Sequence, residues 1–175
     1  LGFAVAFVLF FLIYSRRSLP YLLLGGVLLP IGATLLPDNI VSRALSIGSA
    51  SDSSSMYRIS AWKGVMTMLE EHWLGGIGVG EAAFSTVYPA FSYAGIEGIR
   101  HAHNLYLQIL SETGIAGLLM LVIVLILFVQ NCFEYIYKVR KEAETVVVIA
   151  GLAAVVASLI MGLTDHIWYN YRVFL

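Results

Sequence analysis

Long apolar runs and short basic connections alternate along most of this chain. Three of the runs, residues 19–36, 115–133 and 146–163, are close to the length of about 20 residues with which a helix crosses a bilayer core. The first apolar run, residues 1–14, is shorter. We predict an all-α, polytopic transmembrane helical bundle whose first helix is truncated at its start.

The basic residues of the short connections set the orientation of the predicted spans. Arg16 and Arg17 lie in one connection, and Lys138, Arg140 and Lys141 lie in the other. Counting the spans places both connections on the same side, and the positive-inside rule makes that side the cytoplasm. The long segment between the two pairs of spans is therefore expected on the extracytoplasmic side.

This pattern divides the chain into four parts. Residues 1–36 are predicted to form two transmembrane helices, and residues 37–113 an extracytoplasmic loop with short amphipathic helices. Residues 114–164 are predicted to form two more transmembrane helices joined by a basic cytoplasmic loop. Residues 165–175 form an extracytoplasmic segment that leads towards a further helix. We expect the chain to be the C-terminal part of a larger protein.

Composition places the chain among integral membrane proteins. Hydrophobic residues make up 59% of it and charged residues 12%, and its mean hydropathy is +0.86. The net charge of −1 argues against nucleic acid as a partner, because binding to phosphates needs many Lys and Arg contacts. Cys132 is the single cysteine, which excludes a disulfide within the chain and a thiolate metal cluster.

Within the loop, a serine-rich stretch at residues 46–55 precedes a predicted helix that Ser54 or Ser55 can cap. Apolar residues recur at steps of three and four along this helix and predict that it lies at the membrane surface: Met56, Ile59, Trp62, Val65, Met66, Leu69 and Trp73. Arg58 projects from or beside this stripe. Its guanidinium either extends to lipid headgroups or faces a cavity that holds an anion such as a phosphate.

A dense run of glycines, Gly75–Gly80, follows this helix. Its spacing does not fit a dinucleotide fingerprint, and it lacks the Lys and Ser or Thr of a phosphate-binding loop. We interpret it as a tight connection to a second short helix at residues 81–88.

His101 and His103 stand at alternate positions, and imidazole is a common metal ligand. A zinc site uses three or four protein ligands, whereas His72, His166 and the glutamates show no ligand spacing relative to this pair. We therefore predict no metal site.

His103 is instead a candidate general base. Asn104 is a good helix cap, and residues 105–112 have helical periodicity, so His103 is expected just before a helix N-terminus. The positive end of a helix dipole disfavours an imidazolium, and a neutral imidazole can accept a proton. The residues alone leave open the alternative that His103 only bridges backbone groups at a loop corner.

Four blocks of sequence together resemble the O-antigen ligase and polymerase superfamily: Arg58–Trp62, His72–Gly80, His101–Gln108 and Glu112–Gly117. The resemblance covers roughly residues 56–130. It implies a metal-independent glycosyltransferase of the bacterial cytoplasmic membrane, acting on the extracytoplasmic face. Such enzymes take a glycan from undecaprenyl diphosphate and pass it to an acceptor hydroxyl.

The resemblance also implies roles for particular residues. His103 falls on the catalytic histidine that activates the acceptor hydroxyl, and Arg58 falls on an arginine that holds the donor diphosphate. Arg100, His101 and Asn104 are further substrate-binding candidates, and a second family arginine is expected upstream of this chain. Direct attack implies inversion at the anomeric carbon. No cofactor is expected, and the acceptor is a glycan, a lipid or a protein.

Two other classes of protein remain as alternatives. In a transporter or channel fragment, Arg58, His103 and Asp165 would line a substrate path. In a non-catalytic envelope anchor, the same residues would carry no chemistry. Residues 19–36 and 115–129 contain no ionisable group, which places the polar chemistry at the outer interface and favours the transferase. Asp165 and His166 emerge on that face, where they either border the site or have a structural role, and the structural role is favoured.

Overall fold

The structure is a computed structural model that describes residues 2–38, 40–42, 53–139 and 142–165. Its described residues form helices and connecting turns without a strand, which confirms the all-α prediction. The elements in chain order are α1 (Gly2–Tyr14), η1 (Arg16–Ser18), α2 (Leu19–Ala33), α4 (Ser53–His72), α5 (Glu81–Val87), η2 (Tyr88–Phe91), α6 (Leu105–Val139) and α7 (Glu142–Met161).

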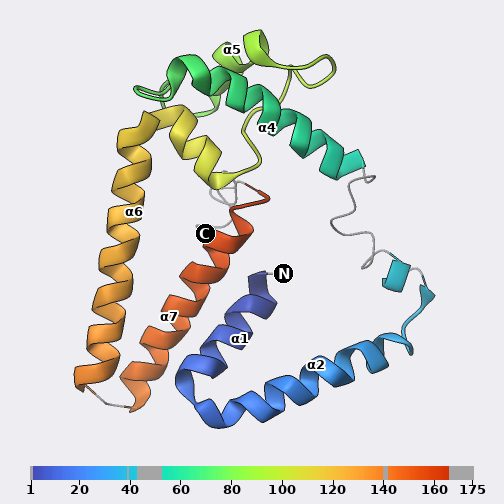
Figure 1. The fold of residues 1–175 in the computed structure, drawn as a ribbon, viewed down its shortest axis with the longest axis vertical. Coiled ribbons are helices and arrows are strands. Elements are labelled where there is room, and N and C mark those ends of the chain that lie inside the picture. The colour runs from blue at the N-terminus through green and yellow to red at the C-terminus, as the bar shows by residue number, and fades with distance from the viewer. Residues whose placement is uncertain (1, 39, 43–52, 140–141, 166–175) are drawn as a thin grey trace.

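Two helices, α6 and α7, are long and apolar enough to cross a membrane. The segments of these helices that meet this condition, Leu105–Lys138 and Ala143–Met161, cover nearly all of the predicted spans at residues 115–133 and 146–163. The two helices run antiparallel, and α1 lies beside α7 (Figure 1). Large apolar side chains along α6, such as Ile123, are half exposed, as expected for a surface that faces lipid.

Helix α2 covers residues 19–33 of the predicted span at residues 19–36. Helix α2 ends at Ala33 after 15 residues and is followed by a turn in which the Thr34 hydroxyl donates a hydrogen bond to the Ile31 carbonyl. Pro37 also disfavours helical backbone at Leu36. At about 1.5 Å per residue, α2 is about 22 Å long and falls short of a bilayer core of about 30 Å.

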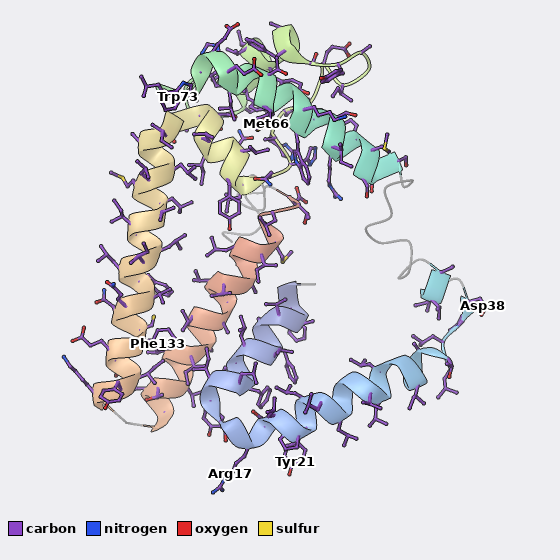
Figure 2. The ribbon with its side chains drawn as sticks, in the orientation of Figure 1. Arg17, Tyr21, Asp38, Met66, Trp73 and Phe133 are labelled. Atoms are coloured by element: carbon purple, nitrogen blue, oxygen red, sulfur yellow. The ribbon has the colours of Figure 1, made fainter. Side chains whose placement is uncertain are left out.

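Helix α4, α5 and η2 form a layer across one end of α6 and α7 (Figure 1). Arg17, in the connection between α1 and α2, and Phe133 of α6 lie towards the opposite end, whereas Met66 and Trp73 lie in the layer (Figure 2). The fold thus separates the connection with Arg17 from the layer along the length of the helices.

A small core holds the layer together, and one face of α4 contributes to it. Met56, Met66 and Trp73 of the predicted apolar stripe are half exposed. The core consists of Ala61, Val65, Met68, Leu69, Phe84, Tyr88, Ile96, Ile99 and Ala102. Val65 and Leu69 of the stripe are buried together with Ala61 and Met68, so the inner face of α4 lies away from Met66.

Tyr88 is the largest side chain in this core. It is fully buried and stacks on Phe84 with ring centroids 5.1 Å apart. Its hydroxyl has no hydrogen-bond partner among the described residues. Burial is the main reason that the pKa of Tyr88 is raised to about 12.

The layer is attached to α6 at a kink. Gly114 has a φ of 66° and a ψ of −168°, which interrupts the helix between its first two turns and its apolar stretch. The backbone N–H of Ile115 donates to the Trp73 carbonyl at 2.8 Å, and that of Ile77 donates to the Ser111 carbonyl at 2.7 Å. A Cβ at Gly114 or Gly76 would overlap the facing backbone, so only glycine allows this close approach.

Candidate active site

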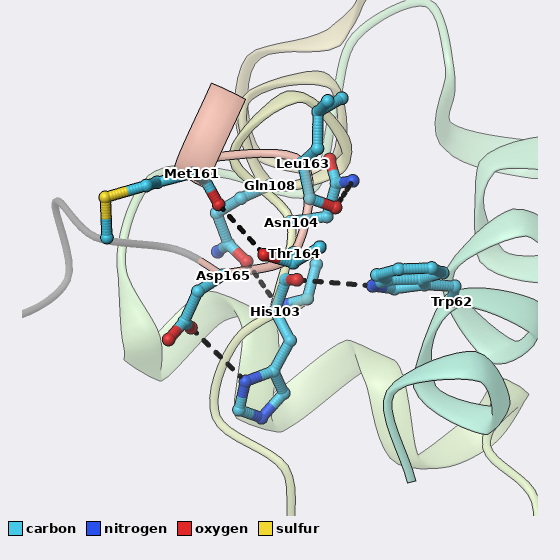
Figure 3. A network of polar contacts seen from close by, with 9 residues as sticks. Trp62, His103, Asn104, Gln108, Met161, Leu163, Thr164 and Asp165 are labelled. Carbon is cyan, nitrogen blue, oxygen red and sulfur yellow. Dashed lines mark hydrogen bonds and ion pairs between the residues drawn. The ribbon is translucent and has the colours of Figure 1, made fainter. Parts of the chain in front are cut away.

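The loop that carries His101 and His103 lies between η2 and α6, where the layer meets the end of α7. Asn104 caps α6, since its Oδ1 accepts hydrogen bonds from the backbone N–H groups of Tyr106 and Leu107, both at 3.0 Å. This confirms the predicted cap. The Asn104 Nδ2 donates to the Leu163 carbonyl at 2.8 Å and ties the loop to the chain just after α7 (Figure 3).

His103 is held from several sides. Its φ of 49° lies in the left-handed region, which costs about 1–2 kcal/mol for an L-residue. Its carbonyl accepts a hydrogen bond from the Trp62 Nε1 at 3.3 Å (Figure 3), and its ring meets the ring of Tyr57 edge-on at 5.7 Å. The ring of His101 lies 4.1 Å from the ring of His103, between centroids. Helix α4 and the capped start of α6 together fix this conformation.

Asp165 reaches the same place from the far end of α7. Its Oδ1 lies 3.5 Å from the His103 Nδ1 (Figure 3). The His103 side chain is 22% exposed and the Asp165 side chain 51% exposed, so the pair stands at an opening rather than inside the core. The sequence favoured a structural role for Asp165, and the geometry places its carboxylate beside His103. His166 lies outside the described residues.

Arg58 approaches the site along α4. It stands one helical turn before Trp62, the residue that bonds the His103 carbonyl, and residues spaced by four lie on one helix face with Cβ atoms about 5–6 Å apart. Its side chain is half buried, and no acidic side chain of the described residues forms an ion pair with it. A guanidinium in this setting can still bind an anion.

Arg100 is directed elsewhere. Its Nη1 forms an ion pair with the Glu81 Oε1 at 3.1 Å, and both side chains are substantially exposed. The structure therefore brings His101 and His103 together with Asp165 and links Arg100 to α5. An exposed pair of this kind contributes little to stability.

A chain of hydrogen bonds through buried Gln108 connects the loop of His101 and His103 to Gly80. Gln108, only 2% exposed, accepts a hydrogen bond from the Ala102 N–H at its Oε1, at 2.6 Å. Its Nε2 donates to the Glu112 Oε1 at 2.8 Å, and that oxygen also accepts from the Gly80 N–H at 3.0 Å. Sequence reasoning assigned no role to Gln108 or Glu112. Their spacing of four on a helix indicates that their side chains can bond to each other. Their partners Ala102 and Gly80 can be identified only from the structure.

Three potential metal ligands meet in this cluster. One ligand atom from each of His101, His103 and Asp165 lies within 4.8 Å of the other two. The sequence offered no third ligand at a recognisable spacing, and Asp165 is far from the histidines along the chain. The donor set of two imidazoles and one carboxylate suits a first-row divalent cation such as zinc.

Comparison with known families adds to this geometry. Residues 1–122 match the O-antigen ligase family. The chain belongs to the O-antigen ligase family. A comparison with curated proteins found no match. The family resemblance recognised in the sequence is thus confirmed.

Membership in the O-antigen ligase family assigns the chain to multi-pass proteins of the inner membrane that are glycosyltransferase-type enzymes and work with lipid-linked glycans. The matched segment includes α4, α5 and the loop with His103, and it ends within α6. Asp165 lies beyond that segment. Its place beside His103 is therefore a finding of the structure alone.

Proposed function

We propose that this chain carries the extracytoplasmic site of a membrane glycosyltransferase. The enzyme transfers a glycan from undecaprenyl diphosphate to an acceptor hydroxyl in the synthesis of cell-envelope polysaccharide. The observation that carries the proposal is the placement of His103, whose ring lies at an opening 3.5 Å from Asp165 at the end of the two apolar helices. Membership in the O-antigen ligase family supports the reaction class.

His103 is proposed to act as the general base. One ring nitrogen faces Asp165, which favours the tautomer with the proton on Nδ1 and leaves the Nε2 lone pair for the acceptor. The acceptor oxygen attacks the anomeric carbon as its proton passes to Nε2. The bond from that carbon to the diphosphate oxygen breaks, and the lipid diphosphate leaves. A single displacement of this kind inverts the anomeric configuration.

Arg58 is proposed to hold the donor diphosphate, because a planar guanidinium can donate two parallel hydrogen bonds to phosphate oxygens. Its place one turn from Trp62 would put these donors next to the His103 loop. Positive donors near the leaving oxygens stabilise the charge that develops there. A lipid diphosphate is already an activated leaving group, so the proposed reaction uses neither a nucleotide nor a metal.

The remaining candidates for substrate contact differ in the bonds that they already form within the protein. His101 stands directly against the His103 ring and is well placed to meet the acceptor. Arg100 would have to exchange Glu81 for a substrate, and Asn104 would have to release the Leu163 carbonyl. We propose His101 as the main contact and a lesser part for Arg100 and Asn104.

The alternative of a transporter or channel fragment predicts polar groups along the membrane-spanning helices. Between Ile115 and Val129 in α6, and between Val146 and Met161 in α7, no residue is ionisable. The ionisable cluster of His101, His103 and Asp165 lies instead just before the start of α6 and just after the end of α7. This arrangement favours chemistry at the membrane surface over passage through it.

A transfer assay with the full-length protein and a lipid-linked glycan donor tests the proposal. His103→Gln removes the base and should lower transfer about 100-fold or more, while donor binding persists. Arg58→Lys keeps the charge but loses the planar fork, so it should weaken donor binding as well as transfer. His72→Gln is the matched control, because His72 lies in the same layer and packs edge-on against Phe91. Near-normal transfer by His103→Gln would refute the proposal.

A further inference from the structure

The cluster of His101, His103 and Asp165 has the dimensions of a metal site as well as of a base with its partner. Ligand bonds to zinc are about 2.0–2.2 Å long, which puts tetrahedral ligand atoms about 3.3 Å apart. The His103 Nδ1 and the Asp165 Oδ1 are 3.5 Å apart, and the three ligand atoms lie within 4.8 Å of one another. Closing the widest of these gaps takes a small side-chain movement.

Two features of the fold allow that movement. The Asp165 side chain is 51% exposed and follows the last turn of α7, so its rotamer can change without disturbing a core. The two imidazoles are already adjacent, with ring centroids 4.1 Å apart. The left-handed backbone conformation of His103 is held by the hydrogen bond that the Trp62 Nε1 donates to the His103 carbonyl. The fold therefore already places both histidine ligands close to the positions that a metal site requires.

The donor set selects the class of cation. Calcium and magnesium prefer shells of oxygen ligands, whereas two imidazoles and one carboxylate match zinc, with a water molecule as the fourth ligand. The nearest cationic side chain along the chain, Arg100, forms its ion pair with Glu81 of α5. Its charge is thereby partly neutralised.

We propose that His101, His103 and Asp165 form an inhibitory Zn²⁺ site. The inhibition, unlike the binding, rests on the proposed function of His103 as the base. A neutral imidazole has one nitrogen lone pair, and its other nitrogen carries a proton. Whichever His103 nitrogen binds zinc, the other then carries the proton, so the ring cannot accept one from the acceptor hydroxyl. Zinc and acceptor activation exclude each other at this residue.

Zinc binding is measured first, on the metal-free full-length protein in nanodiscs, with Co²⁺ as a spectroscopic probe and Zn²⁺ as its competitor. The wild type should bind one Co²⁺ with a tetrahedral spectrum that Zn²⁺ abolishes. His101→Gln and Asp165→Asn should each weaken binding about 100-fold or more, since even the loss of outer-shell partners costs 10–100-fold. His72→Gln, the matched control, should bind as the wild type does.

The absence of a Co²⁺ spectrum, or equal binding by the wild type and both ligand variants, would overturn the site. Thermal unfolding of each variant without metal shows whether it is folded. Should one variant fail to fold, the other still decides, because each removes a different ligand.

Inhibition is measured separately, by transfer activity with and without Zn²⁺. Wild-type transfer should stop at zinc concentrations that fill the site and return after chelation. Zinc binding without loss of transfer would overturn the inhibitory role, and loss of activity on chelation with rescue by zinc would overturn it as well. The failure of the proposed function is a different result, namely normal transfer by His103→Gln in zinc-free buffer.

Discussion

Gln108 is the residue whose replacement most directly tests how the fold holds the His103 loop. We expect Gln108→Leu, which keeps the size of the side chain and removes its polar end, to destabilise the protein. The Ala102 N–H would lose its acceptor at a buried position, at a cost of about 1–3 kcal/mol. Glu112 would keep the hydrogen bond from the Gly80 N–H but lose the one from the Gln108 Nε2. The loss of that bond adds about 1 kcal/mol to the destabilisation.

The sum is about 2–4 kcal/mol, which corresponds to a fall in Tm of roughly 4–16 °C for a chain of this size. Thermal unfolding followed by circular dichroism in detergent measures it. Transfer activity should fall by more than the loss of folded protein explains, because Ala102 stands between His101 and His103. Donor binding through Arg58 should be retained.

Glu112→Gln is the matched control for this prediction. A glutamine at this position keeps an oxygen that can accept from both the Gly80 N–H and the Gln108 amide, so we expect a loss of no more than about 1 kcal/mol. If the two variants have the same Tm, or if Gln108→Leu has the same Tm as the wild type, the chain of hydrogen bonds does not hold the loop.

Three further predictions concern the rest of the fold. Gly114→Ala should destabilise the protein by at least about 1–2 kcal/mol in thermal unfolding, because the glycine has a positive φ and faces backbone, whereas Gly75→Ala, which meets open space, should not. Tyr88→Phe should leave stability unchanged or raise it. Since the pKa of Tyr88 is raised from 10.0 to about 12, the wild type should lose stability relative to this variant between pH 10 and about 12, and no relative loss would refute the burial argument. Cysteines at Ala90 and Lys138 should react with an impermeant thiol reagent in intact cells only at Ala90, and the reverse pattern would refute the orientation.

The sequence predicted those parts of the fold that depend on local composition. The apolar lengths of α6 and α7, the short helix α5 and the Asn104 cap are properties of neighbouring residues, and the structure has them where they were expected. Helix α2 ends earlier than the predicted residue 36, because a count of apolar residues does not register where a helix ends. The turn at Thr34 stops it three residues before Pro37.

The inner face of α4 and the third member of the histidine cluster depend on tertiary contacts. A helical period fits Met66 as readily as Met68, and only the packing of Phe84 and Tyr88 against α4 buries the second of these. Asp165 meets His103 because α7 returns to the start of α6, where the Leu105 N–H donates to the Gly162 carbonyl at 2.7 Å. No local pattern could have placed these two residues together.

The beginning of α6 explains why the polar cluster can lie so close to an apolar helix. Asn104, Gln108 and Glu112 are spaced by four and form one polar ridge, which bonds in turn the chain after α7, the histidine loop and the α4–α5 connection. Continued straight into lipid, such a ridge would leave polar groups where they are costly to bury. The kink at Gly114 changes the direction of the chain between this polar ridge and the apolar stretch that follows it. The same helix can therefore cross the membrane and organise a polar site at its edge.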